Sequence, residues 1–214
     1  MHRAGVIGTG SSLPEKVVRN ADLEKLVDTT DEWIVQRTGI EARRFVEPGV
    51  ATSDMALSAS QMALQNAGIT ANDLDMILFA TLSPDFCFPG TGVILQRKLG
   101  LVTSDSPNFV PAMDIRNQCS GFLYGLGTAT AMVRSGGCKN VLLVGAETHS
   151  AAIDLSTNGR TVSSLFGDGA GAVVVSATDE DRGVRSWHLG ADGRFAENLA
   201  QKIWDIRKRP FIPV

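Results

Sequence analysis

Hydrophobic residues along the chain form two kinds of pattern. Near-continuous apolar runs occur at 75–82 (DMILFATL), 140–147 (NVLLVGAE) and 170–177 (AGAVVVSA), and such runs are typical of strands that are buried on both faces of a sheet. Apolar residues with helical spacing occupy 53–68 and 119–134, which predicts two further helices. Strands that alternate with helices favour βα units, so the pattern predicts a layered α/β fold.

Weaker patterns predict the remaining elements. The apolar pair Val6 and Ile7, followed by glycines and Pro14, indicates a strand that enters a turn. Residues 108–115 predict another strand, and Pro111 favours an edge position because proline cannot donate a hydrogen bond to a neighbouring strand. No composition shift or low-complexity segment divides the chain. The other expected elements are helices at 20–27, 29–39, 89–100 and 197–208, and a strand at 184–191.

The composition restricts the function classes. The 214 residues are 43% hydrophobic, enough for a substantial core, and their formal charge of -3 offers no basic excess for a nucleic acid backbone. No apolar run approaches the roughly 18–20 residues of a membrane span, and the first residues lack the apolar stretch of a signal peptide. We therefore expect a cytoplasmic protein with no membrane partner. Three scattered cysteines fit reduced thiols, and three histidines without a CxxC or HExxH pattern give little support for a metal site.

Cys119 is the first candidate for chemistry. It follows the predicted edge strand and precedes a helical pattern, within DIRNQCSGFLYGL (114–126). At a helix start, unpaired N–H groups and the helix dipole favour a thiolate, and a sharp strand-to-helix turn exposes the side chain. The alternative is a buried and inert cysteine, since unpaired cysteine is among the most buried residue types. Position alone leaves both interpretations open.

Other chemistry-bearing residues are weaker candidates. The glycines of GTGSS (8–12) and FGDGAGA (166–172) lack the strand, glycine and helix context of a dinucleotide site, so tight turns or a close backbone approach explain them better. His149, at the end of a predicted strand, is the one histidine considered as a base, although a structural role fits it better. Arginines near predicted loops could bind an anion, but each alone is more typical of a solvated charge: Arg37, Arg43, Arg44 and Arg160.

Three motifs, in this order and spacing, carry a resemblance. EWIVQRTGI (32–40), NQCSGFLYGL (117–126) and FGDGAGA resemble the β-ketoacyl-acyl carrier protein synthase III family of the thiolase superfamily, from the N-terminus to about Arg194. The resemblance implies an α/β, thiolase-like layered αβαβα fold. Residues 1–180 would form the N-terminal half with the nucleophilic cysteine, and 181–214 the start of the second half. The apolar residues of the final RKRPFIPV add the expectation that the chain is cut at Val214.

The resemblance also implies a reaction. Cys119 takes the place of the family's nucleophile, which accepts an acyl group from acyl-coenzyme A and yields it to a carbanion made by decarboxylating malonyl-acyl carrier protein, the first condensation of fatty acid biosynthesis. The coenzyme A thioester is a substrate, no cofactor is bound permanently, and a homodimer is expected. Positions that match the family's coenzyme A residues are Trp33, Arg37 and Arg160, near the adenine and phosphates, and more loosely Thr29, Thr38 and Phe166. Indole stacking and arginine contacts suit such a nucleotide.

Departures from the family leave three functions open. Asn117 and Gln118 replace small alanines of many members, and Thr161 replaces a common glycine after Arg160, so the acyl preference and a loop near the coenzyme A position can differ. The family completes its site with a histidine and an asparagine that would lie beyond Val214, and oxyanion donors of this kind carry roughly 10²–10³ of rate each. The hypotheses are a decarboxylating condensing enzyme, a non-condensing acyltransferase or thioesterase-like relative, and an inactive half-domain that needs a complementing chain.

Overall fold

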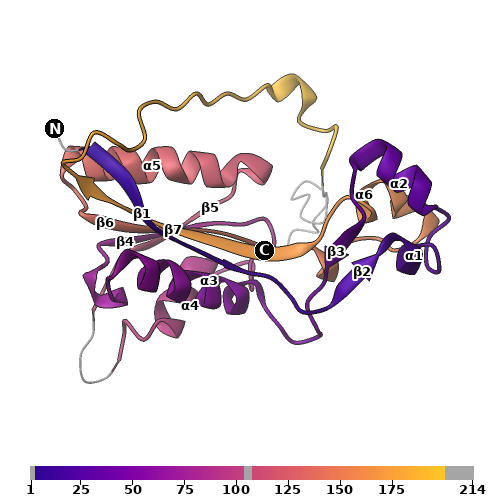
Figure 1. The fold of residues 1–214 in the computed structure, drawn as a ribbon, viewed down its shortest axis with the longest axis horizontal. Coiled ribbons are helices and arrows are strands. Elements are labelled where there is room, and N and C mark those ends of the chain that lie inside the picture. Colours follow the sequence, from indigo (N-terminus) through magenta and orange to yellow (C-terminus); the bar gives the residue numbers. More distant parts are fainter. Residues whose placement is uncertain (1–2, 104–107, 201–214) are drawn as a thin grey trace, which may run out of the picture.

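A five-stranded mixed sheet forms the centre of the computed structural model, which describes residues 3–103 and 108–200 (Figure 1). The strands lie in the order β1-β7-β6-β4-β5. β4, β5 and β6 are parallel, while β7 runs antiparallel between β6 and β1. β5 is an edge strand, as Pro111 predicts. The strand bounds are β1 (Arg3–Ser12), β4 (Met76–Ala80), β5 (Ala112–Ile115), β6 (Asn140–Thr148) and β7 (Asp168–Thr178).

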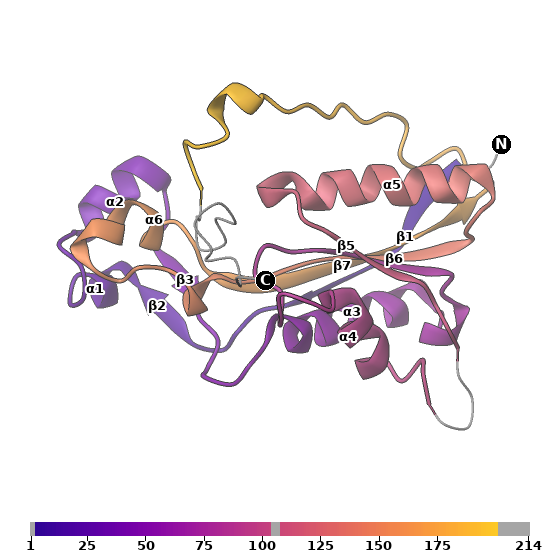
Figure 2. The ribbon, with the colours of Figure 1, turned by 180° about the vertical axis from the view of Figure 1, so that it is seen from behind.

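Helices cover both faces of this sheet. α3 (Thr52–Ala67) and α4 (Thr91–Lys98) lie on one face, and α5 (Gly121–Ser135) lies on the other (Figures 1 and 2). Alternate residues of β6 enter the two cores: Leu142 and Val144 pack on the side of α3, and Val141 and Leu143 on the side of α5. Burial on both sides explains why the central strands read as continuous apolar runs. The layered α/β arrangement is therefore confirmed.

The glycines of GTGSS permit a close approach between β1 and α3. A Cβ placed on Gly8 would lie 2.2 Å from the carbonyl oxygen of Ala63, and one on Gly10 would lie 2.1 Å from that of Ala59. Only a residue without a side chain fits at such distances from a helix backbone. These glycines therefore serve helix-to-strand packing, in agreement with the rejection of a dinucleotide site.

A smaller lobe lies at one end of the sheet, beyond the start of α5 (Figures 1 and 2). A small apolar cluster of Val18, Leu23 and Ile34 holds it together. α2 ends at Thr38, and the following Gly39 has a φ of 71°, a left-handed conformation that glycine adopts readily at the end of a helix. The elements of the lobe are β2 (Val17–Arg19), α1 (Asn20–Leu23), α2 (Asp31–Thr38), β3 (Ala42–Arg44) and α6 (Arg160–Ser163).

Arg43 connects this lobe to the segment before β7. It is only 7% exposed, and its guanidinium donates to the carbonyl oxygens of Val18 (3.3 Å) and Ser164 (3.0 Å) and to Oδ1 of Asn20 (2.8 Å). Burial lowers the pKa of Arg43 from its usual value. The interpretation of Arg43 as a solvated or anion-binding charge is therefore wrong, because both terminal nitrogens of its guanidinium donate to groups inside the protein. Its buried Nε has no hydrogen-bond partner among the described residues.

Some predicted elements differ from the structure. The helix expected at 20–27 ends at Leu23, and the segment 184–191 forms no strand. That segment crosses the outer side of α5, where the Tyr124 hydroxyl donates to the carbonyl of Gly190 over 3.2 Å. The alternating pattern of 184–191 resembles that of a strand, but no described strand lies beside the segment to pair with it. Of the helix expected at 197–208, residues 197–200 are not helical and 201–208 lie outside the described residues. None of the described helices combines the length and apolarity needed to cross a membrane.

Candidate active site

The carboxyl ends of three parallel strands meet at one edge of the sheet. Ala80 at the end of β4 pairs with Ile115 of β5 and with Gly145 of β6. β7 begins at the same edge, since Asp168 pairs with Thr148 at the end of β6. Ligands of open α/β sheets bind beyond this type of edge. The candidate residues on the adjoining segments are Cys119, His149 and Phe166.

Cys119 lies in a 3-10 turn, Gln118–Ser120, between β5 and α5. Its thiol is exposed, so the strand-to-helix turn is confirmed and the interpretation as a buried filler is wrong. α5 begins just after the turn, at Gly121, where an added Cβ would lie 3.3 Å from Cβ of Ala80. The start of α5 is thus packed against the end of β4, which fixes the cysteine beside the carboxyl ends of the strands.

Gln118 holds an unusual backbone conformation immediately before Cys119. Its φ is 45°, and it is the one non-glycine residue with a positive φ in the part of the chain that the structure describes. Non-glycine residues in this region are strained, and such strain is concentrated at functional sites. Apart from the departure from the family already noted at this position, no sequence feature predicted this conformation.

The other two cysteines are poorer candidates for a nucleophile. Cys138 is partly buried, and burial, followed by the charge of Asp75, raises the pKa of its thiol. Cys87 is exposed on the loop between β4 and α4, and it lies farther from the first residue of α4 than Cys119 does from that of α5. Of the three thiols, only Cys119 combines exposure with a position at a helix start.

Glu147 fixes the loop that follows β4. Its carboxylate accepts hydrogen bonds from the N–H groups of Leu82 (2.8 Å) and Ser83 (3.0 Å) and from the hydroxyls of Thr81 and Ser83. This carboxylate joins the carboxyl end of β6 to that of β4. Sequence reasoning missed Glu147, and the signal that could have found it is an acidic residue at the end of a buried apolar run.

Asp168 anchors the turn that carries His149. Its carboxylate is 6% exposed and accepts hydrogen bonds from the N–H of Val46 (2.8 Å) and from the N–H (2.8 Å) and hydroxyl of Ser150. His149 follows β6 as expected, and its ring centroid lies 4.7 Å from that of Phe166. His149 and Phe166 therefore lie together near the carboxyl end of β6. The buried carboxylate of Asp168, which sequence reasoning also missed, holds the turn that carries His149.

Trp33, Arg37 and Arg160 lie together in the lobe. The guanidinium carbon of Arg37 is 4.3 Å from the centroid of the Trp33 ring, and that of Arg160 is 4.7 Å from it. Arg160, from α6, also donates to the carbonyl of Asp28 over 2.7 Å. Cation–π attraction stabilises this arrangement. It places the planar N–H donor groups of two guanidiniums beside one indole ring. An adenine base could stack on the ring only where a guanidinium turned away from it.

The two threonines near this cluster differ in their roles. Thr29 has a buried hydroxyl with no hydrogen-bond partner in the described structure, so it retains a free donor beside α2. The Thr38 hydroxyl donates to the carbonyl of Ile34 (2.8 Å) and accepts from the N–H of Ile40 (3.0 Å), which helps to end the helix. In the described residues, no group of three or more potential ligands is arranged to hold a metal ion.

Comparisons with known proteins agree with these motifs. A family profile described as 3-oxoacyl-[acyl-carrier-protein] synthase III matches residues 113–193, which include Cys119 and FGDGAGA. A β-ketoacyl-[acyl-carrier-protein] synthase III of Halalkalibacterium halodurans is 48% identical over 202 residues, which cover 94% of this chain and 62% of that protein. Over most of its length the chain is therefore similar to the ketoacyl synthase III family.

Solved structures extend this agreement to the fold. A ketoacyl synthase III from Thermus thermophilus is 40% identical with a TM-score of 0.84, covering 92% of this chain and 58% of that one. The priming β-ketosynthase of the R1128 polyketide pathway is 35% identical with a TM-score of 0.76, covering 84% and 51%. The fold is therefore thiolase-like. The chain spans 55–62% of the length of the curated synthase III relatives that it matches.

Proposed function

We propose that Cys119 is acylated by an acyl-coenzyme A. Its thiolate sulfur forms a bond to the thioester carbonyl carbon, the bond from that carbon to the coenzyme A sulfur breaks, and the released thiolate takes up the proton that Cys119 gave up. The observation that carries this proposal is an exposed cysteine in the turn before α5, at the carboxyl ends of β4 and β5. The turn leaves the sulfur open to an approaching thioester, and the start of α5 follows it directly.

The cluster of Trp33, Arg37 and Arg160 is proposed as the coenzyme A site. Two guanidiniums beside one indole suit a nucleotide with several phosphates, because each fork can bind phosphate oxygens in a bidentate manner. The buried, unpaired hydroxyl of Thr29 adds a donor next to them. Phe166 packs beside His149, in the segment that connects α6 of the lobe to β7 of the sheet. We propose that it contacts the bound thioester.

Acylation can be tested on the 214-residue chain itself. Incubation with acetyl-coenzyme A is expected to add one acetyl group, measured by intact mass. Cys119→Ala should remove the adduct, and Cys138→Ala, a matched loss of a less reactive thiol, should retain it. Arg160→Gln should raise the acetyl-coenzyme A concentration for half-maximal acylation by about 10-fold, the loss of one charged hydrogen bond. An unmodified wild-type chain, or an adduct that survives Cys119→Ala, would refute the proposal.

Condensation is the second step that we propose, with malonyl-acyl carrier protein as the donor. The names of the relatives support an acyl carrier protein substrate. The resemblance assigns decarboxylation to a histidine and an asparagine outside these 214 residues. We therefore expect the acyl-cysteine to form on this chain, and carbon dioxide release from malonyl-acyl carrier protein to be slow unless those residues are supplied.

A non-condensing acyltransferase is the alternative. The departure at Asn117 and Gln118, together with the strained φ of Gln118, favours an altered acyl site. The similarity to a priming ketosynthase of a polyketide pathway also leaves the pathway open. Sequencing the gene beyond the codon for Val214 separates the cases. An open frame with the histidine and asparagine supports condensation, whereas a stop codon supports the non-condensing enzyme or a subunit that needs a complementing chain.

A homodimer through the edge strand β5 is proposed as the assembly. β5 pairs with β4 on one side, and no other described strand pairs with its second edge. Apolar residues on or beside this edge are exposed, Phe109 by 76% and Met113 by 40%. An exposed edge with apolar side chains is a template for pairing with another strand.

A further inference from the structure

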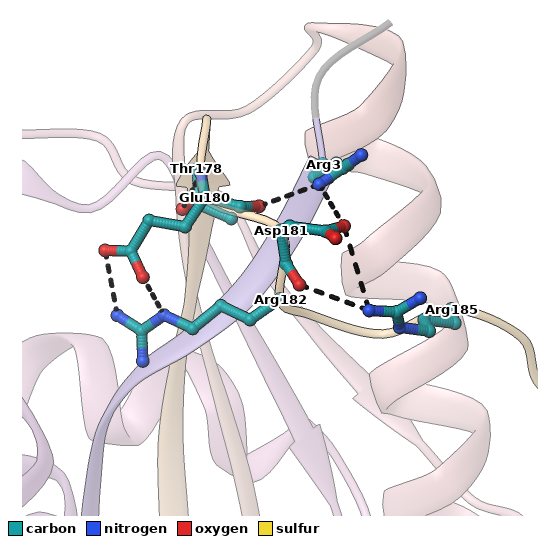
Figure 3. Close-up of polar contacts among 6 residues, drawn as sticks. All are labelled: Arg3, Thr178, Glu180, Asp181, Arg182 and Arg185. Carbon is teal, nitrogen blue, oxygen red and sulfur yellow. Dashed lines mark hydrogen bonds and ion pairs between the residues drawn. The ribbon is translucent and has the colours of Figure 1, made fainter.

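An arginine-lined hollow lies at the end of the molecule opposite the lobe. Its volume is about 250 Å³. It lies where the start of β1, the last turn of α5 and the turn after β7 meet (Figure 3). α5 has 15 residues, so its two ends are separated by about 20 Å, and Cys119 precedes the other end. The lining residues, named here the arginine hollow, are Arg3, Arg134, Asp181, Arg182, Gly183, Val184 and Arg185.

The backbone of this hollow is held in place. Gly183 has a φ of 131°, and a Cβ on it would lie 2.3 Å from the carbonyl oxygen of Ala4. The N–H of Val184 donates to that same oxygen over 2.9 Å. The N–H of Glu180 donates to the hydroxyl of Thr178 over 3.1 Å. The turn after β7 is therefore fixed against β1, and the arginines on it project from a defined backbone.

The charges of the hollow do not cancel. Asp181 lies between Arg3, at 2.6 Å, and Arg185, at 3.7 Å, while Arg182 pairs with Glu180 (Figure 3). Arg134, on the last turn of α5, has no ion pair or hydrogen-bond partner among the described residues. Four guanidiniums thus face two carboxylates and leave a net charge of +2.

The free donors define the ligand chemistry. Each guanidinium presents five N–H groups in a planar fork that matches phosphate and carboxylate oxygens, and few of these groups are used by the protein. The carboxylate of Asp181 already contacts both Arg3 and Arg185. An anion in the hollow can therefore be shared by two guanidiniums. The volume exceeds that of one phosphate, and the net charge matches an anion of at least two charges.

We propose that the arginine hollow binds a small anion with two linked phosphate groups. The site is independent of the proposed coenzyme A site, which lies in the lobe at the far end of the sheet (Figures 1 and 2). Because its side chains are exposed to solvent, binding is sensitive to salt and is strongest at low ionic strength.

Calorimetric titration of pyrophosphate tests the proposal. The titration uses an Arg37→Gln/Arg160→Gln background, which removes the other pair of arginines able to bind phosphate. One saturable site is expected in this background at low ionic strength. Orthophosphate should bind at least about 10-fold more weakly, because it spans fewer guanidiniums.

Variants locate the site. Arg134→Gln and Arg185→Gln should each weaken pyrophosphate binding by roughly 3- to 10-fold, since each removes charged hydrogen bonds at an exposed position. Arg194→Gln is the matched control, because Arg194 is an exposed arginine that pairs with Asp192 outside the hollow. Circular dichroism melting confirms that each variant is folded.

Four outcomes would overturn the assignment. The first is an absence of saturable binding in the Arg37→Gln/Arg160→Gln background, which would place the anion at the coenzyme A site instead. The second is an equal loss of affinity in Arg194→Gln, which would indicate a general charge effect. The third is unchanged affinity in both hollow variants, and the fourth is equal affinity for orthophosphate. None of them bears on acylation of Cys119, so the two proposals fail separately.

Discussion

Backbone strain lies directly beside the proposed nucleophile. Gln118 has a φ of 45° and directly precedes the exposed Cys119. For a residue with a Cβ, the left-handed region costs about 1–2 kcal/mol relative to the right-handed one. The surrounding fold must offset that energy, and the start of α5, packed on β4, is the neighbouring element. We interpret the strained conformation of Gln118 as part of the turn that positions the Cys119 thiol.

Replacement of Gln118 tests this interpretation. Gln118→Gly is expected to raise the free energy of unfolding by about 0.5–1 kcal/mol, because glycine adopts positive φ without strain. It should also slow the acylation of Cys119 by roughly 3- to 10-fold, since the turn becomes less rigid and a misplaced group loses rate steeply. Urea unfolding and the rate of acetyl adduct formation measure the two effects.

Asn117→Gly is the matched control. Asn117 has a φ of -136°, so glycine relieves no strain there and should lower the free energy of unfolding by a few tenths to 1 kcal/mol. Stabilisation by Asn117→Gly equal to that by Gln118→Gly, or faster acylation in Gln118→Gly, would contradict a positioning role for the strained residue.

Most elements follow from short-range pattern, and the exceptions have a physical cause. The strands β4, β6 and β7 and the helices α3 and α5 were predicted from apolar runs and helical spacing, since burial on two faces or on one determines that pattern. Met62 fits the apolar face of α3 by spacing, yet it is 44% exposed. The segment 184–191 alternates like a strand but has no partner to pair with. The periodicity of a segment can be read from a few neighbouring residues, whereas the strand that would pair with it lies far away in the sequence.

The contact between β1 and α3 shows a requirement at the scale of elements. Gly10→Ala would place a Cβ 2.1 Å from the carbonyl oxygen of Ala59 and 2.6 Å from the nitrogen of Ala63. Both atoms belong to helix backbone and cannot rotate away. The substitution is expected to lower the free energy of unfolding by about 2–3 kcal/mol, the upper part of the range for overpacking.

Gly171→Ala provides the comparison for Gly10→Ala. Gly171 lies on the neighbouring strand β7, paired with Ser11, and an added Cβ meets no atom within 4 Å. Alanine there should be neutral or stabilising by up to about 1 kcal/mol, because it restricts the unfolded chain. Chemical denaturation of both variants decides the matter, and an equal effect of the two substitutions would exclude helix packing as the reason for the glycine.

At the scale of the whole molecule, the candidate sites separate along the sheet. The proposed coenzyme A cluster lies in the lobe, Cys119 lies just before the start of α5, and the arginine hollow is lined by Arg134 from the last turn of α5. Figure 1 shows the lobe near one end of α5 and the start of β1 near the other. The resemblance to the synthase III family, and not residue type alone, singled out Cys119, Trp33, Arg37 and Arg160 as candidates. Glu147 and Asp168 escaped notice because their importance depends on backbone N–H groups from distant loops, which the sequence does not display.

The proposed assembly gives the last prediction. If two copies pair along β5, Met113→Lys should place a charge in the interface at a residue that is already 40% exposed in one chain, and so weaken dimerisation at least about 10-fold without unfolding the monomer. Leu165→Lys is the control, because Leu165 is a similarly exposed apolar residue (48%) in the segment between α6 and β7. Light scattering over a concentration series measures the dissociation constant. A wild-type chain that stays monomeric, or a dimer weakened equally by both substitutions, would rule out β5 as the interface, because pairing through an edge strand requires a response confined to that edge.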